Sequence, residues 1–188
     1  MKKLILFAFT LLSLASTVNA QKEKDTRYGK NIVSFIPFAA FTKNSVGVGA
    51  SYEGMLNEYI GLKVPLFTAI NQRYYAAALA LKLYPTKNNG PAKYAIAPTL
   101  MFGAGDERDG GRILDPATNT FTNTTTQRTR FGFLLNNTFN FTIMKQFYIG
   151  IDGGLGVNYY DQEVKNNGAQ FNSTSFLAQI HFSTGYRF

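Results

Sequence analysis

The feature that most constrains the fold of this chain is an alternation of apolar and polar residues with a period of two. The clearest example runs from Phe147 to Tyr160. Its apolar parity contains Phe147, Ile149, Ile151, Leu155, Val157 and Tyr159, and its other parity contains mainly glycine and polar residues. Neighbouring side chains of a β-strand point to opposite faces of the sheet. The segment is therefore expected to be a strand with an apolar environment on one face and a polar environment on the other.

The same alternation recurs along the chain, in segments 46–52, 60–66, 75–83, 94–102 and 131–139. One further segment, 30–41, is apolar on both parities, so the pattern assigns no face to it. The expected strands that contain these segments are roughly 10 to 14 residues long, whereas strands of soluble proteins average about 5 or 6 residues and membrane-crossing strands need about 9 to 11. The pattern therefore favours an all-β, transmembrane, antiparallel up-and-down β-barrel of about eight strands over a soluble β-sandwich.

Two prolines, Pro65 and Pro98, fall inside these expected strands. Proline has no amide hydrogen to donate to the ladder of a sheet. We therefore expect a bulge or missing ladder hydrogen bonds at both positions.

The connections between the expected strands differ in length. They are 43–45, 55–58, 70–73, 85–92, 105–128, 142–146 and 161–173. If the amino-terminal end of the barrel lies in the periplasm, the two longest connections, 105–128 and 161–173, are both extracellular. Outer-membrane barrels have short periplasmic turns and longer extracellular loops. We therefore predict that these two segments are solvated surface loops.

The amino-terminal twenty residues have the pattern of a cleavable signal peptide. Lys2 and Lys3 precede an apolar run from Leu4 to Ala15, and Val18 and Ala20 are small enough for the signal peptidase site. The run is too short to cross a bilayer as a helix. We expect cleavage after Ala20, a short periplasmic segment over 21–29 and a barrel over 30–188.

The carboxyl-terminal strand has aromatic residues at the positions that an outward face requires. Counting back from the end, Phe188, Tyr186, Phe182 and Ile180 share one parity. A terminal aromatic residue behind an apolar parity resembles the assembly signal of bacterial outer-membrane proteins, which the barrel-assembly machinery reads. The same aromatic side chains would lie at the periplasmic girdle of the barrel.

The signal peptide, the alternating strands and the terminal Tyr186-Arg187-Phe188 together resemble the small outer-membrane barrels of Gram-negative bacteria. Ser51-Tyr52-Glu53 and Leu83-Tyr84-Pro85 are similar to stretches of the Bacteroidetes-type outer-membrane β-barrel domain family. This resemblance implies the cell outer membrane as the location. It also implies two partners, outer-membrane lipids including lipopolysaccharide and the barrel-assembly machinery. It implies no specific chemistry, and we expect a monomer.

The composition argues against several classes of function. The chain has no cysteine, so disulfides, thiolate chemistry and a lipidated cysteine anchor are excluded. Its formal net charge of +8 is not gathered into a basic stripe, so no nucleic-acid partner is expected. The acidic stretch from Asp106 to Gly111 lacks the spacing of a calcium loop. We predict no metal site and no cofactor.

The inward parity of the expected strands carries charged and titratable residues. They are Glu53, Lys63, Lys82, Arg130, Asp152, His181 and Arg187. The lumen of an eight-stranded barrel is narrow enough for side chains to fill, and charges buried there need partners. We expect an interior network of ion pairs in which Glu53 and Asp152 pair with lysine and arginine residues. Such a network is either a polar core or the gate of a conduit for small ions.

The only histidine, His181, precedes Ser183 in a His-x-Ser spacing that resembles the catalytic pair of barrel lipid A deacylases. Those enzymes act as Ser-His-acid hydrolases on the lipid-facing wall. Here both residues lie on the parity opposite to that of Phe188. His181 and Ser183 are therefore expected to point inward. Thr184 also stands where that family has asparagine. We therefore expect His181 to be a hydrogen-bonded interior residue.

Three functions can be built on such a barrel. The first is an anchor that presents 105–128 and 161–173 for contact with ligands or neighbours. The second is a narrow, porin-like channel or a transporter of small hydrophobic molecules, which needs a hydrated lumen or a lateral opening. The third is a membrane lipid hydrolase, which needs a lipid-facing triad. The first needs no special residues, so we predict a non-enzymatic outer-membrane protein with a structural, surface-interaction or binding role.

Overall fold

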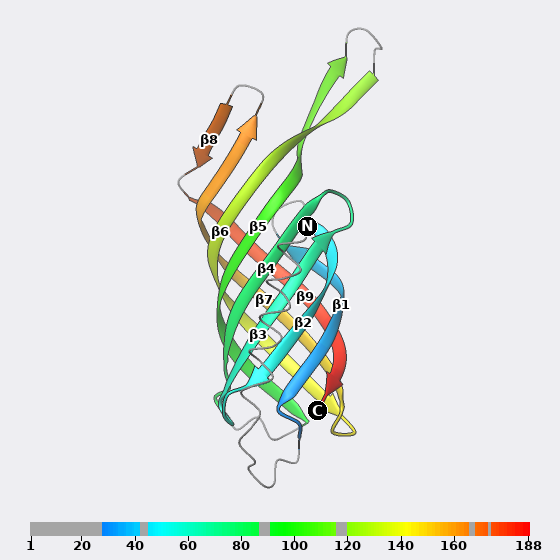
Figure 1. Cartoon of the computed structure of the whole chain (residues 1–188), viewed down its shortest axis with the longest axis vertical. Coiled ribbons are helices and arrows are strands. Elements are labelled where there is room, and N and C mark those ends of the chain that lie inside the picture. The colour runs from blue at the N-terminus through cyan, green and yellow to red at the C-terminus, as the bar shows by residue number, and fades with distance from the viewer. Residues whose placement is uncertain (1–27, 42–44, 87–90, 116–119, 166–167, 173) are drawn as a thin grey trace, which may run out of the picture.

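The computed structural model describes residues 28–41, 45–86, 91–115, 120–165, 168–172 and 174–188. These residues form nine antiparallel strands: β1 (Asn31–Phe41), β2 (Val46–Met55), β3 (Ile60–Ala69), β4 (Tyr74–Leu83), β5 (Ala92–Asp115), β6 (Thr120–Ile143), β7 (Phe147–Lys165), β8 (Gly168–Asn172) and β9 (Ser175–Arg187). Eight strands close a barrel, because β1 pairs with β9 and β6 pairs with β7 (Figure 1). The short β8 extends β7 as a hairpin. The predicted eight-stranded antiparallel barrel is confirmed. Among the residues described here, no helix has both the length and the apolar character needed to cross a membrane.

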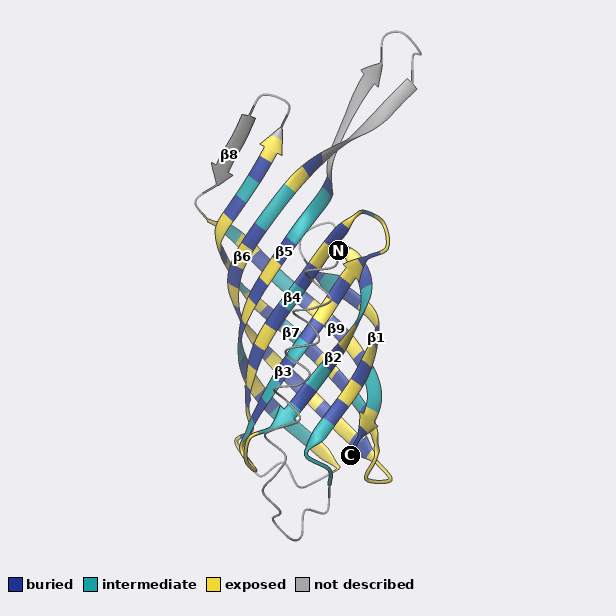
Figure 2. Ribbon diagram, in the orientation of Figure 1, coloured by how far each residue is buried: buried dark blue, intermediate teal, exposed yellow. Residues whose placement is uncertain are grey.

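Buried and exposed residues alternate along the strands of the barrel wall (Figure 2). Large apolar side chains such as Phe35, Leu79 and Phe133 are exposed on the outer surface. Lys63 and Lys82, in contrast, are 2% and 0% exposed. This distribution is the reverse of that of a soluble protein, and it is the distribution of a barrel that is surrounded by lipid.

A bulge explains why the first strand shows no alternation in the sequence. The register of β1 shifts between Ile36 and Ala39 against β2, and between Phe35 and Phe38 against β9. Pro37 and Phe38 are consequently both exposed. The inward positions are even-numbered up to Ile36 and odd-numbered from Ala39 on. Since the inward residues Ile36 and Ala39 are apolar and the outward residues Pro37 and Phe38 are apolar too, neither parity could be recognised.

Both strand prolines interrupt one ladder and leave the register intact. Between β3 and β4, the described pairing passes from Lys63–Ala80 to Leu66–Ala77 without a partner for Pro65. On its other side Pro65 pairs with Ser51 in an unbroken register. Pro98 behaves in the same way, pairing with Leu135 of β6 but with no described residue of β4.

The predicted loops 105–128 and 161–173 are in large part strands, which corrects the expectation from sequence. The strand β5 leaves β4 at the Tyr74–Gly105 pair and continues alongside β6 to the pair Asp115–Thr120. The hairpin projects well beyond the rest of the barrel, and β7 and β8 form a second, shorter projection beside it (Figure 1). The alternation fails here because a strand that continues beyond the apolar surroundings of the barrel wall has no reason to carry an apolar parity.

A second bulge shifts the inner face of β7. The pairing with β6 jumps from Phe131–Tyr160 to Gly132–Asn158, so Tyr159 is the extra residue. The sequence alternation predicts Tyr160 inside, but this residue is exposed and Asp161 takes the inward position. The bulge lies at the level where the barrel wall gives way to the projecting hairpins.

Candidate functional site

The lumen is filled by side chains arranged in successive levels along the barrel axis. On β6 the inward positions are, in order, Arg130, Gly132, Leu134, Asn136, Thr138, Asn140 and Thr142. On β9 they are Ser175, Leu177, Gln179, His181, Ser183, Gly185 and Arg187. Each strand therefore passes through an apolar level, an amide level and further polar levels before it reaches the far end of the barrel. The candidate site is built from these levels.

The ion pair between Lys63 and Asp152 crosses the lumen. Lys63 Nζ donates to Asp152 Oδ2 over 2.7 Å, and both side chains are almost fully buried. Lys63 belongs to β3 and Asp152 to β7, which are on opposite sides of the closed ring. Thr138 Oγ1 donates to the second carboxylate oxygen of Asp152 over 2.7 Å. The Asp152 carboxylate thus has partners on both oxygens, as a buried charge requires.

A second ion pair joins β2 and β4 next to the first. Lys82 Nζ donates to Glu53 Oε2 over 2.8 Å and to Asn140 Oδ1 over 3.2 Å. Tyr84 donates its hydroxyl hydrogen to Glu53 Oε1 over 2.5 Å. Glu53 is the register partner of Lys63, so the two ion pairs occupy adjacent positions of the wall. We call the set of Glu53, Lys63, Lys82, Asn140, Asp152 and His181 the lumen network.

His181 belongs to the lumen network and makes no contact of the catalytic type with Ser183. Its Nε2 lies 3.0 Å from Asp152 Oδ2 and 3.3 Å from Lys63 Nζ. Its Nδ1 lies 2.9 Å from Gln179 Nε2. Ser183 donates its hydroxyl hydrogen to the carbonyl oxygen of Gly150 over 3.2 Å. Both His181 and Ser183 are buried inside the barrel, away from the wall that would meet lipid.

Arg187 and Arg130 lie outside the lumen network, at opposite ends of the barrel. Arg187 donates to the carbonyl oxygen of Gly29 over 2.7 Å, and its guanidinium group lies 5.2 Å from the ring centroid of Tyr28. It is therefore bound by the segment that precedes β1. Arg130 lies at the other end, where the hairpins project.

Arg130 is part of a charged cluster that the sequence analysis missed. Its Nη2 lies 2.7 Å from Glu107 Oε2, and its Nε lies 3.2 Å from Asp161 Oδ1. Arg128 Nη2 lies 2.7 Å from Glu163 Oε2. These five residues, the mouth cluster, join β5, β6 and β7 where the hairpins leave the barrel. Four of the five lie in segments that were predicted to be loops. Arg128 and Arg130 share a parity, as do Asp161 and Glu163, and these matching parities are the available signal.

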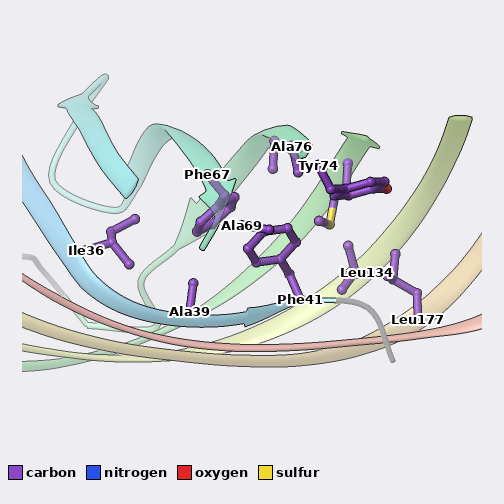
Figure 3. Close-up of a cluster of buried hydrophobic side chains, with 11 residues drawn as sticks. Ile36, Ala39, Phe41, Phe67, Ala69, Tyr74, Ala76, Leu134 and Leu177 are labelled. Carbon is purple, nitrogen blue, oxygen red and sulfur yellow. The ribbon is translucent and has the colours of Figure 1, made fainter. Parts of the chain in front are cut away.

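An apolar layer separates the mouth cluster from the lumen network. The buried rings of Phe41 and Phe67 have centroids 5.2 Å apart, and the ring centroid of Tyr74 lies 6.2 Å from that of Phe41. Leu134 of β6 and Leu177 of β9 complete the layer (Figure 3). Phe67 also meets the edge of the His181 ring, at 5.3 Å between centroids. The layer thus packs directly on the lumen network.

The four residues of the expected assembly signal point outward. Phe188, Tyr186, Phe182 and Ile180 are all exposed on the outer surface. The end of their strand is fixed by two backbone hydrogen bonds of 2.8 Å between Asn31 and Phe188, which close the seam between β1 and β9. These four side chains therefore face the surroundings of the barrel and not its interior.

No group of three or more histidine, cysteine, aspartate or glutamate residues with the geometry of a metal site occurs in the described ranges. The arrangement provides buried ion pairs, an apolar layer and a hydrogen-bonded histidine. Of the two residues that the sequence offers as a catalytic pair, Ser183 bonds a backbone carbonyl and His181 bonds the lumen network.

Comparison with known proteins supports the fold. No protein-family model matches the chain, and no curated protein sequence matches it. Among solved structures, the chain is similar to the outer membrane protein OprG of Pseudomonas aeruginosa, with a TM-score of 0.54 and 11% identity over 87% of this chain and 99% of that one. It is also similar to a major outer membrane protein of Thermus thermophilus, with a TM-score of 0.53 and 12% identity over 84% of this chain and 98% of that one. At these identities the likeness concerns the fold alone: a closed membrane-type β-barrel.

Proposed function

We propose that this protein is an outer-membrane anchor that holds two β-hairpins at the surface of a Gram-negative cell. The apolar outer wall supports a place in the bilayer, because a belt of exposed large apolar residues this extensive would otherwise cause aggregation. The single observation that carries the proposal is the continuation of β5 and β6 far beyond the last pairing of β5 with β4.

The filled lumen supports an anchor more than a conduit. The Lys63–Asp152 pair crosses the barrel at one level, and the apolar layer fills it at another. An ion that passed through would have to break a buried ion pair and also cross a dehydrated layer, and both steps are costly. The channel and transporter functions therefore have less support than the anchor.

The mouth cluster supports a binding role for the hairpins. Its ion pairs connect β5, β6 and β7 at the base of the two projections. Ion pairs that link three strands hold them in one arrangement, which lowers the entropy that a projecting surface loses on binding. The hairpins would thus be presented in one orientation.

The remaining parts of the proposal concern processing and partners. We propose cleavage after Ala20, recognition of Phe188 and its strand by the barrel-assembly machinery, and a monomer surrounded by outer-membrane lipids including lipopolysaccharide. We further propose membership of the Bacteroidetes-type outer-membrane barrel domain family, on the basis of the stretches around Tyr52 and Tyr84. A lipid hydrolase has no support from the geometry, because Ser183 bonds Gly150 and not His181.

An epitope accessibility experiment tests the proposal. One variant carries an epitope in the connection between β5 and β6, and the matched variant carries it after Lys145, in the exposed turn between β6 and β7. Intact cells should bind the antibody only in the first case, and permeabilised cells in both. Labelling of intact cells only through the Lys145 epitope would reverse the orientation and refute the proposal.

A further inference from the structure

Two amide oxygens inside the barrel have no hydrogen-bond partner within the described part of the chain. They are Asn136 Oδ1 and Gln179 Oε1, on residues that are 3% and 4% exposed. Leaving a buried carbonyl oxygen unpaired costs about 1–3 kcal/mol, and native proteins contain few such groups. Two at the same level of one lumen therefore require a physical explanation.

Exchanging the oxygen and nitrogen of either amide does not remove the problem. Asn136 Nδ2 donates to Thr99 Oγ1 over 2.8 Å, and that hydroxyl donates in turn to the Ala97 carbonyl oxygen over 2.9 Å. Gln179 Nε2 lies 2.9 Å from His181 Nδ1. Each amide thus has one end engaged, and rotating it would replace an unpaired acceptor by an unpaired donor.

The two amides lie on either side of one glycine. Gly154 of β7 pairs with Asn136 of β6 on one side and with Gln179 of β9 on the other. A Cβ atom on Gly154 would overlap Asn136 Oδ1, so the amide of Asn136 lies directly over this glycine. Because paired strands are about 4.8 Å apart, Asn136 Oδ1 is about one strand spacing from the backbone of Gln179. Asn136 and Gln179 are therefore neighbours on the inner wall, with Gly154 alone between them.

The residues around the two amides define the chemistry of a guest. The other register partner of Asn136 is Ala97, so the wall on both sides of this amide carries the smallest residue types. Leu134 and Leu177 lie one inward position away on the side of the apolar layer, and Thr138 and His181 lie one position away on the other side. A guest bound here would be shielded from the mouth of the barrel by apolar side chains.

We propose that Asn136 and Gln179 bind a small guest that donates two hydrogen bonds, one to each amide oxygen. A water molecule or an ammonium ion has this chemistry, and buried waters commonly satisfy polar groups in this way. The guest would complete a hydrogen-bonded chain across the barrel, from Lys63 through Asp152, His181 and Gln179 to Asn136 and Thr99. The site is independent of the proposed function of the hairpins.

Nuclear magnetic resonance of the full chain in detergent micelles tests the site directly. With labelled asparagine and glutamine side chains, the amide hydrogens of Asn136 and Gln179 should show a cross-relaxation signal with water. If ammonium is the guest, ammonium chloride should instead shift both amide signals in a saturable manner that sodium chloride does not reproduce. Asn140 is the matched control, because its oxygen and nitrogen both have protein partners and it should give neither signal.

A double-mutant cycle tests whether one guest links the two residues. We expect the unfolding rates of Asn136→Ala, Gln179→Ala and the double variant to be non-additive, with the double effect at least about threefold smaller than the product of the single effects. Additive effects would overturn the proposal. Wild-type amide signals without contact to water or response to ammonium would overturn it as well, even if the variants did not fold.

Discussion

Lys63 and Asp152 form an ion pair of 2.7 Å across the lumen, although their strands stand on opposite sides of the barrel. The contact is possible because an eight-stranded barrel is narrow enough for side chains from facing walls to meet. The ion pair obstructs the lumen as a path for ions and links two facing strands of the barrel wall. The stability of the barrel and the closure of its lumen should therefore depend on the same residues.

Replacing Asp152 alone should be strongly destabilising. The variant Asp152→Asn leaves Lys63 buried without its counter-ion, and removing one partner of a buried pair costs about 3–5 kcal/mol. Urea unfolding of the refolded protein in micelles, followed by heat-modifiable mobility in gels, measures the change. The control Lys63→Met/Asp152→Leu removes both charges, and its free energy of unfolding should be closer to that of the wild type than the free energy of the single variant is. A single variant as stable as wild type would contradict this assignment.

Gly103 should not tolerate a side chain. A Cβ atom there would overlap the ring and hydroxyl group of Tyr74, which is buried in the apolar layer. Forcing extra volume into a packed interior costs about 1–3 kcal/mol, so Gly103→Ala should lower the free energy of unfolding by this amount. Gly153→Ala is the matched control, because its Cβ would meet no atom within 4 Å. Equal stabilities of the two variants would argue against this packing.

Arg187 should stabilise the end of the barrel where the chain closes. Its side chain holds Gly29 by a hydrogen bond of 2.7 Å and covers the ring of Tyr28. Arg187→Met loses these contacts, and we expect the free energy of unfolding to fall by about 1.5–3 kcal/mol, the range for a hydrogen bond to a charged group. Thermal unfolding in micelles reports the effect. Lys145→Met, in the exposed turn at the same end, should have no measurable effect, and a similar loss there would point to general charge effects.

Phe188 should matter for assembly in cells more than for stability in vitro. Its ring lies on the outer surface, where lipid or detergent contacts it and no neighbouring strand depends on it for packing. The purified Phe188→Ser variant should still refold in micelles, and it should lose no more than the about 1.5–3 kcal/mol that removal of one large apolar side chain from water is worth. The amount of folded protein in the outer membrane should nevertheless fall several-fold. Equal amounts in the membrane would refute the role of Phe188 as an assembly signal.

The sequence predicts the barrel where the two faces of a strand have different environments. Segments such as 147–157 alternate because lipid lies on one side and the polar lumen on the other. The position of Lys63, Lys82 and Asp152 inside the barrel follows from the same parity. The parity does not predict which charges form pairs. Lys63 contacts a strand on the far side of the ring, and this contact can be found only when the order of the strands around the closed barrel is known.

The sequence fails where this difference in environment disappears. In β1 the apolar layer inside matches the apolar exterior, and the bulge at Pro37 and Phe38 moves the inner parity by one residue. In the projecting hairpins no apolar parity exists, so the pattern predicts loops at Glu107 and Asp161 although both are buried in ion pairs. A bulge shifts the parity and a projecting strand has no apolar parity, and both features therefore emerge only from the structure.

Single-channel recording in planar lipid bilayers tests the central claim, that the lumen is closed by its own side chains. Wild-type protein and the Glu53→Gln variant, which weakens the Lys82–Glu53 pair, would be reconstituted from the same folded, heat-modifiable fraction. We predict no resolvable unitary current for the wild-type protein. A stable unitary conductance of the wild type, altered in Glu53→Gln, would contradict the account and establish the barrel as a channel.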